Sequence, residues 1–494
     1  MMPSTGRGEP QQPPPPPPRQ EGLGFVHGWT RYALASAALL VPCFWQSRIQ
    51  AGDLGSHIYN AWLAELIRHG QAPGLAIVSQ KTNVLFDLLL DWLFRAVGSA
   101  AAQRIAVSLA VLVFTWGAFA FIAAAARRQW AVLPAIAMLA YGWVYHMGLF
   151  NFYLSLGLCF WALALSWSFA PRRLLAAVPV LAVACVAHAL TVVWACGALG
   201  LVWLARRRFV KRVWLLAGVL VAIDVLHIAL AATTEMGWNV AQLRLVAGVD
   251  QVWVYNDKYW IPCLGLLLLF VALAVESIRR RGARSFFGHD LMLVLLATAA
   301  GVFLLPTWVY LPGYQHALSF IAERMSLAVG VLAVAAVATV GFRRWHSWVA
   351  AAAAAAFFLF LYADERALNR FEDQTRNVVA QLPSMARVVS NADADVRINA
   401  LTHIIDRVCI ERCYSFANYE PGTGQFRIRI TGPTTIVAPV HGSSRIQNGE
   451  YVVEARDLPL YRISVAADDS LIVKSMAAGE RTGISRWKGM QKTL

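Results

Sequence analysis

The chain has 494 residues, of which 58% are hydrophobic and only 14% are charged. Soluble domains carry about 25% charged residues, so this composition excludes an ordinary soluble protein and predicts an integral membrane protein. The formal net charge of +15 would suit a nucleic-acid ligand. However, many basic residues lie in short runs between apolar segments, as in the cytoplasmic loops of membrane proteins. We therefore expect membrane lipids as partners and no nucleic acid.

The chain begins with a proline-rich tail and continues into a series of apolar segments. Residues 1–28 include six consecutive prolines, a composition typical of a disordered, here cytoplasmic, tail. Residues 29–362 form a predicted transmembrane domain, and its first span is about 29–45. Further segments approach the ~20 residues that cross a bilayer. They lie at 104–125, 130–146, 149–170, 173–188, 190–205, 213–232, 259–277, 288–306, 324–341 and 346–362.

Arginine-rich runs set the predicted topology. They occur in every second loop, for example at 206–208 and 279–281, and cytoplasmic loops are the ones enriched in arginine and lysine. Because basic runs flank both ends of 174–205, this stretch is expected to cross twice as a tight hairpin that turns near His188. The result is about eleven transmembrane helices in the plasma (inner) membrane, with the N-terminus cytoplasmic and the C-terminal region extracytoplasmic.

The longest loop, 47–103, is predicted on the outer side and carries the candidate catalytic residues. Asp53 and His57 lie four residues apart on a predicted helix. This helix should end at Gly70, because glycine commonly terminates helices. The plain alternative is that Asp53 caps the helix and that His57 hydrogen-bonds a neighbouring helix.

A second helix is predicted later in the same loop. The apolar part of residues 83–97 is too short to span a bilayer, and Asp87, Asp91 and Arg95 are spaced four residues apart on one face. This pattern predicts an amphipathic helix that lies on the membrane surface.

Beyond residue 362 the composition becomes polar and predicts a small extracytoplasmic α+β domain over 363–494. A helical start at 364–382 is followed by short runs of β-type residues separated by turn residues. Cys409 and Cys413 could form a disulfide in an oxidising compartment, and no second cysteine pair completes a zinc site. The predicted strands are 426–430, 435–440, 451–455, 461–465 and 471–473.

Polar residues at the outer ends of the spans are the candidate substrate-binding residues. Arg324 suits a phosphate or pyrophosphate, because its planar guanidinium binds such oxygens in pairs. The alternatives are that Glu323 and Arg324 are interfacial charges, and that the lone histidines are packing residues. Within a span, Asp224 and His227 form a further polar pair one turn apart. The candidate set is His146, Asn151, His188, Tyr310, His316, Glu323 and Arg324.

The architecture and the motif GDLGSH around Asp53 resemble the GT-C-type membrane glycosyltransferases, over about residues 29–362. The resemblance is to the bacterial branch that takes sugars from polyprenyl-phosphate donors. It implies that Asp53 acts in catalysis, as a general base or through a metal. Many members carry two adjacent acids at this point, whereas Leu54 follows Asp53 here. His57 is therefore the candidate second group, and a divalent metal cofactor is left open.

The leading hypothesis is a glycosyltransferase that moves a sugar from a polyprenyl-phosphate donor to an acceptor at the outer face of the membrane. Asp53 would deprotonate the acceptor hydroxyl, and Arg324 would hold the donor phosphate. A second hypothesis is a transporter or flippase of lipid-linked glycans that uses Asp224 and His227 as a polar relay. A third is a non-catalytic membrane assembly protein.

Overall fold

The computed structural model describes residues 24–126, 130–207, 211–312, 317–340 and 342–490, and these are mostly helical. The chain divides into two compact units, one containing α1 (Gly24–Leu40) and one that begins at Leu40. Most of the predicted tail 1–28 lies outside the described residues, and α1 begins inside its predicted range.

Among the described residues, five helices are long and apolar enough to cross a membrane. The structure therefore supports a polytopic helical fold, and each predicted span coincides with at least one helix. The long helices are α3 (Leu85–Ala126), α9 (Arg212–Thr233), α10 (Trp260–Arg281), α13 (Ile321–Ala338) and α14 (Arg344–Val379). Shorter helices among them are α4 (Leu133–Ala140), α5 (Trp143–His146), α6 (Phe150–Ser166), α7 (Pro171–Ala187), α8 (Ala189–Ala205), α11 (Ala283–Phe287) and α12 (Asp290–Leu304).

The structure shows a break in one predicted span and a turn between two others. The segment 130–146 is not one helix, because α4 ends at Ala140 and Gly142 adopts an extended conformation before α5. A Cβ at Gly142 would lie 2.6 Å from the carbonyl oxygen of Gln251, so the break allows two backbones to approach closely. The predicted turn near His188 is present, since this extended residue ends α7 and precedes α8.

The loop 47–103 forms the two predicted helices. The first, α2 (Leu54–Arg68), ends as expected before Gly70, which has a φ of 71°. The second is the N-terminal part of α3, which Gly98 separates from the rest of that helix with a φ of 76°. In this part Leu88 and Trp92 are exposed and Asp91 is buried. One face of the helix is therefore apolar and exposed, as in an amphipathic helix.

The C-terminal region contains a four-stranded sheet with the order β6-β4-β8-β9. The central strand β4 runs parallel to both neighbours, and β8 and β9 form an antiparallel hairpin. The predicted strands 461–465 and 471–473 correspond to β8 and β9, whereas 435–440 forms no strand. The strands are β4 (Ala386–Ser390), β6 (Cys413–Ser415), β8 (Leu460–Val465) and β9 (Leu471–Ser475). Cys409 and Cys413 form a disulfide between α15 (Ile404–Cys409) and β6.

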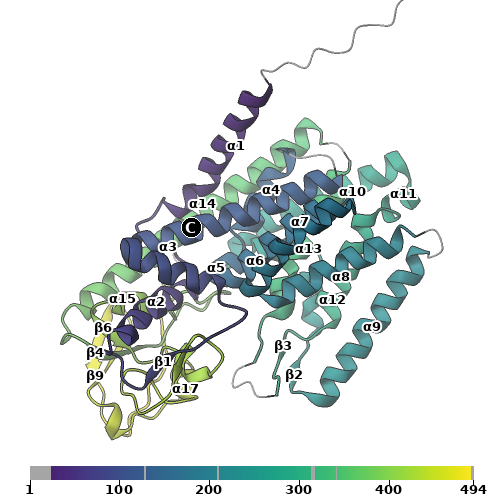
Figure 1. Cartoon of the computed structure of the whole chain (residues 1–494). Helices are drawn as coiled ribbons and strands as arrows, with labels where there is room; N and C mark the ends of the chain where they lie inside the picture. The colour runs from purple at the N-terminus through teal and green to yellow at the C-terminus, as the bar shows by residue number, and fades with distance from the viewer. Residues whose placement is uncertain (1–23, 127–129, 208–210, 313–316, 341, 491–494) are drawn as a thin grey trace, which may run out of the picture. The chain divides into compact units, whose positions relative to one another are not determined.

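The C-terminal region is joined to the loop 47–103 and to the helices. Strand β1 (Leu75–Ile77) of the loop pairs antiparallel with β7 (Ile428–Ile430), so the two regions share a small sheet (Figure 1). Helix α14 runs without a break through the predicted domain boundary at 362/363, because no glycine or proline interrupts it. The α2 segment therefore lies between the helices and the C-terminal strands.

A buried arginine fixes this junction. Arg407 on α15 makes two hydrogen bonds to the carboxylate of Glu372 on α14, at 2.6 and 3.1 Å, and a third to the carbonyl oxygen of Ile49 at 2.7 Å. The side chains of Arg407 and Glu372 are 4% and 0% exposed. Because water does not reach these two side chains, the charges of Arg407 and Glu372 are stabilised by the protein groups that contact them.

Replacing Arg407 with alanine should destabilise the protein by about 3–5 kcal/mol, because it leaves the Glu372 carboxylate buried without its main partner. Thermal unfolding in detergent measures the effect. The matched control is Arg376→Ala, which removes a half-exposed partner of the same carboxylate and should cost at most about 1 kcal/mol. Equal effects of the two substitutions would contradict the assignment.

Candidate active site

The glycines of the GDLGSH motif allow two backbones to approach Asp53. The amide nitrogens of Gly52 and Asp53 donate hydrogen bonds to the carbonyl oxygens of His146 and Met147, at 2.7 and 3.0 Å. A Cβ at Gly52 would lie 2.8 Å from the Met147 oxygen. Only glycine fits there, and the backbone of Asp53 is consequently held against the end of α5.

The second glycine of the motif holds the start of α2 against the C-terminal region. A Cβ at Gly55 would lie 2.0 Å from the carbonyl oxygen of His403. Because no side chain fits at that distance, any other residue would push the His403 segment away from α2. The motif therefore brings two distant parts of the chain to the two sides of Asp53.

The side chain of Asp53 faces His403 and does not cap the helix. Asp53 occupies the N-cap position, but its carboxylate makes no capping hydrogen bond, so the capping alternative is wrong. Its Oδ1 atom lies 3.6 Å from Nε2 of His403, and Nδ1 of His403 lies 2.7 Å from Asp406. Burial by itself lowers the pKa of His403, but Asp406 and Asp53 raise it above its usual value.

His57 is paired with Asp87 and not with Asp53. Its Nδ1 atom lies 2.6 Å from Oδ1 of Asp87, and Asn151 donates a hydrogen bond of 2.8 Å to the other oxygen of Asp87. Burial by itself lowers the pKa of His57, but Asp87, Glu420 and Asp53 raise it to about 9. His57 is therefore cationic at neutral pH and hydrogen-bonds the neighbouring helix α3, as the plain alternative expected.

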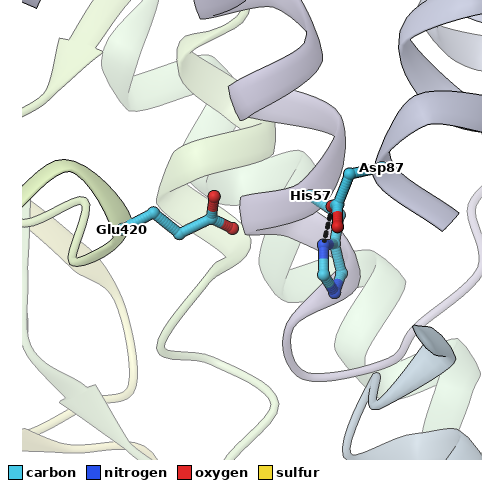
Figure 2. Close-up of side chains that lie close together, drawn as sticks. All are labelled: His57, Asp87 and Glu420. Carbon is cyan, nitrogen blue, oxygen red and sulfur yellow. Dashed lines mark hydrogen bonds and ion pairs between the residues drawn. The ribbon is translucent and has the colours of Figure 1, made fainter. Parts of the chain in front are cut away.

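A second buried acid faces this pair. Glu420 begins the one-turn helix α16 (Glu420–Thr423), and Figure 2 shows its carboxylate extending toward His57 and Asp87 from a separate segment. Burial raises the pKa of Glu420, and the Asp87 carboxylate raises it further, against the opposing charge of His57. Glu420 is 4% exposed and accepts one long hydrogen bond, 3.4 Å, from Ser56.

His57, Asp87 and Glu420 could together hold a divalent metal ion. One ligand atom from each lies within 4.8 Å of the others, and a histidine with two carboxylates suits zinc or a similar ion. The three residues also line a small pocket, together with Asn60, Gln80 and Arg427. A metal ion would displace the proton that His57 shares with Asp87. Asp53, the residue for which the resemblance implied a metal, is outside both the group and the pocket lining.

Arg324 and His188 form a cationic and polar pair near Asp53. Nη1 of Arg324 lies 3.4 Å from Nε2 of His188. Since arginine can only donate, His188 accepts with Nε2 and carries its proton on Nδ1. Among the described residues, neither Nδ1 of His188 nor the buried Nε of Arg324 has a hydrogen-bond partner. Asp53 is the strongest opposing charge acting on Arg324.

Several other predicted site residues have different surroundings. His146 is fully buried, its Nε2 lies 3.3 Å from Glu365 of α14, and its main-chain oxygen accepts the hydrogen bond from the Gly52 amide. The carboxylate of Glu323 accepts a hydrogen bond from the hydroxyl of Thr307. Tyr310 is 40% exposed and its ring contacts Trp308. His316 lies outside the described residues.

Sequence reasoning missed the residues that the C-terminal region supplies. His403 and Asp406 are three residues apart, as on one face of a helix, and this spacing was a usable signal. Glu420 stands in a Glu-Pro-Gly-Thr-Gly stretch that predicts only a turn. Nothing local links Glu420 to His57, which is more than three hundred residues earlier in the chain.

Comparisons of the chain with protein-family models, with curated proteins and with solved structures gave no match. Its function must therefore be inferred from the geometry of the site.

The His57–Asp87 pair predicts a specific dependence of stability on pH. Because the pKa of His57 rises from 6.5 to about 9 on folding, the pair should contribute about 3 kcal/mol below pH ~6.5 and lose it as pH rises through ~9. Melting temperatures measured in detergent across this range test it. The dependence should disappear in His57→Gln and persist in the control His69→Gln, an exposed histidine after α2. A wild-type curve without this loss would contradict the ion pair.

Proposed function

We propose that the protein is a membrane glycosyltransferase that moves a sugar from a polyprenyl-phosphate donor to an acceptor at the outer face of the membrane. The observation that carries the proposal is that Asp53, a partly exposed carboxylate without a capping role, acts electrostatically on Arg324, which pairs with His188. Within the part of the chain that the structure describes, each of these two side chains has one buried nitrogen without a hydrogen-bond partner. Transfer of a sugar from a phosphate leaving group requires a base for the acceptor hydroxyl and an anion-binding group for the phosphate.

The proposed topology has eleven crossings, with the N-terminus in the cytoplasm and the C-terminal region outside. Support comes from the arginine runs and from the helices that coincide with the predicted spans. In this arrangement the α7–α8 turn at His188 and the start of α13 at Arg324 lie on the outer side, together with α2. A lipid donor would then reach the site sideways from the outer leaflet.

In the proposed reaction the acceptor hydroxyl attacks the anomeric carbon of the sugar, and the bond from that carbon to the phosphate oxygen breaks. Asp53 takes the hydroxyl proton. Arg324 and His188 donate hydrogen bonds to the polyprenyl phosphate as it leaves with the bonding electron pair. Burial strengthens these charge interactions, because little water competes for the donors.

The remaining groups position this machinery. His403 is held by Asp406 and faces the Asp53 carboxylate, so it orients that carboxylate. His57 and Asp87 join α2 to α3, and Asn151 fixes Asp87 from α6. We assign His57 a positioning role in place of the direct catalytic role that the resemblance suggested.

The competing hypotheses have less support from these contacts. A relay would need Asp224 and His227 to face a common interior path. Asp224 is exposed on α9, and His227 bonds the main-chain oxygen of Leu304. A non-catalytic assembly protein would not need unpaired donors beside a carboxylate.

Asp53→Asn should lower the rate of sugar transfer by roughly 100- to 10,000-fold, because the amide cannot accept the proton. The assay uses labelled polyprenyl-phosphate sugars and lipid extracts with purified full-length protein. The control Glu65→Gln changes a surface acid on the same helix and should leave the rate unchanged. Retained activity in a folded Asp53→Asn protein would refute the assignment.

Arg324→Gln should raise the KM for the lipid donor by roughly 10- to 100-fold, the loss expected for a hydrogen bond to a charged group. Arg324→Lys should recover part of this loss, since lysine keeps the charge but not the paired donors. Arg244→Gln is the control, because Arg244 is exposed on the predicted outer loop before α10. An unchanged KM in Arg324→Gln would exclude Arg324 from donor binding.

A further inference from the structure

Helix α9 is the least enclosed of the long apolar helices. It has 22 residues and a mean hydropathy of 2.4 over its most apolar part, and none of that part is buried. One side packs against α12 and α8. The remaining surface is apolar, as expected of a helix surrounded by lipid or by another membrane helix.

The outward side of α9 carries a seam suited to helix packing. Trp214, Gly218, Val221, Val225 and Ile228 are all exposed, with alternating spacings of four and three residues. This is the spacing that lets one helix follow another along its length. A Cβ at Gly218 would meet nothing within 4 Å. The seam thus has a small residue where a second backbone could approach closely.

A carboxylate stands beside this seam. Asp224 lies near the middle of α9, between Val221 and Val225, and it is exposed. No described residue donates a hydrogen bond to it or forms an ion pair with it. His227, one turn away, already bonds the carbonyl oxygen of Leu304 through Nδ1. At this depth an acidic side chain would face hydrocarbon, where a charge without a partner is strongly unfavourable.

We propose that the outer face of α9 binds a transmembrane helix of a partner protein that carries a lysine or arginine at mid-bilayer depth. The positive charge would pair with Asp224, and the apolar side chains would pack along the seam past Gly218. A second copy of this chain does not fit, because a symmetric contact would bring two Asp224 carboxylates together. The proposal requires that α9 crosses the membrane, but it does not depend on the transferase activity.

The test uses energy transfer between the labelled full-length protein in phosphatidylcholine vesicles and labelled transmembrane peptides. The peptides are leucine–alanine helices with either one central lysine or a leucine at that position. The lysine peptide should bind the wild type roughly 5- to 30-fold more tightly than the leucine peptide does, the range measured for polar contacts between membrane helices. This preference should disappear in Asp224→Leu.

Asp224→Leu should fold normally, because it adds an apolar residue to a lipid-facing helix, and its melting temperature checks this. Gly218→Leu is a second variant that keeps the carboxylate but blocks close approach, and it should weaken the lysine peptide without affecting the fold. Equal binding of both peptides, absence of binding, or unchanged binding to Asp224→Leu would refute the proposal. A further control measures energy transfer between two differently labelled copies of the wild type. If that transfer occurs and is lost in Asp224→Leu, the face binds a second copy of the chain and the proposal is refuted.

Discussion

The close approach of three backbones at Gly52 and Gly55 is the constraint on which the site depends. Gly52 contacts the Met147 carbonyl and Gly55 contacts the His403 carbonyl, at distances that exclude any side chain. These contacts place the start of α2 between the membrane helices and the C-terminal region. Without the contact at Gly55, the His403 segment would move away from Asp53.

The charges at this junction are arranged so that nearly every buried acid has a partner. His57 pairs with Asp87, and Arg407 pairs with Glu372. His403 lies close to both Asp406 and Asp53. Glu420 differs, because its main neighbour is another carboxylate and burial favours its neutral form. Arg324 differs in the opposite sense, because the Nε–H of this cation has no hydrogen-bond partner among the described residues. An incoming anion is the simplest partner for that donor, which is why a phosphate-linked substrate suits the site.

Local patterns predicted the local structure well. The apolar segments, the end of α2 at Gly70, the α7–α8 turn at His188 and the surface helix before Gly98 all follow from short-range sequence rules. The strand β4 and the unbroken helix α14 were missed, because their neighbours in space decide them. Half of the site was missed for the same reason: His403 and Glu420 reach α2 only through tertiary packing, and no spacing in the sequence connects them to Asp53.

In the proposed function, Asp53, Arg324 and His188 belong to one substrate site on the outer side of the membrane. An experimental structure of the full-length protein in lipid nanodiscs with a bound polyprenyl phosphate tests it most directly. The phosphate should contact the guanidinium of Arg324 and the ring of His188, and the Asp53 carboxylate should face the position of the sugar. A phosphate bound away from Arg324, or an Asp53 side chain turned from the lipid headgroup, would contradict it.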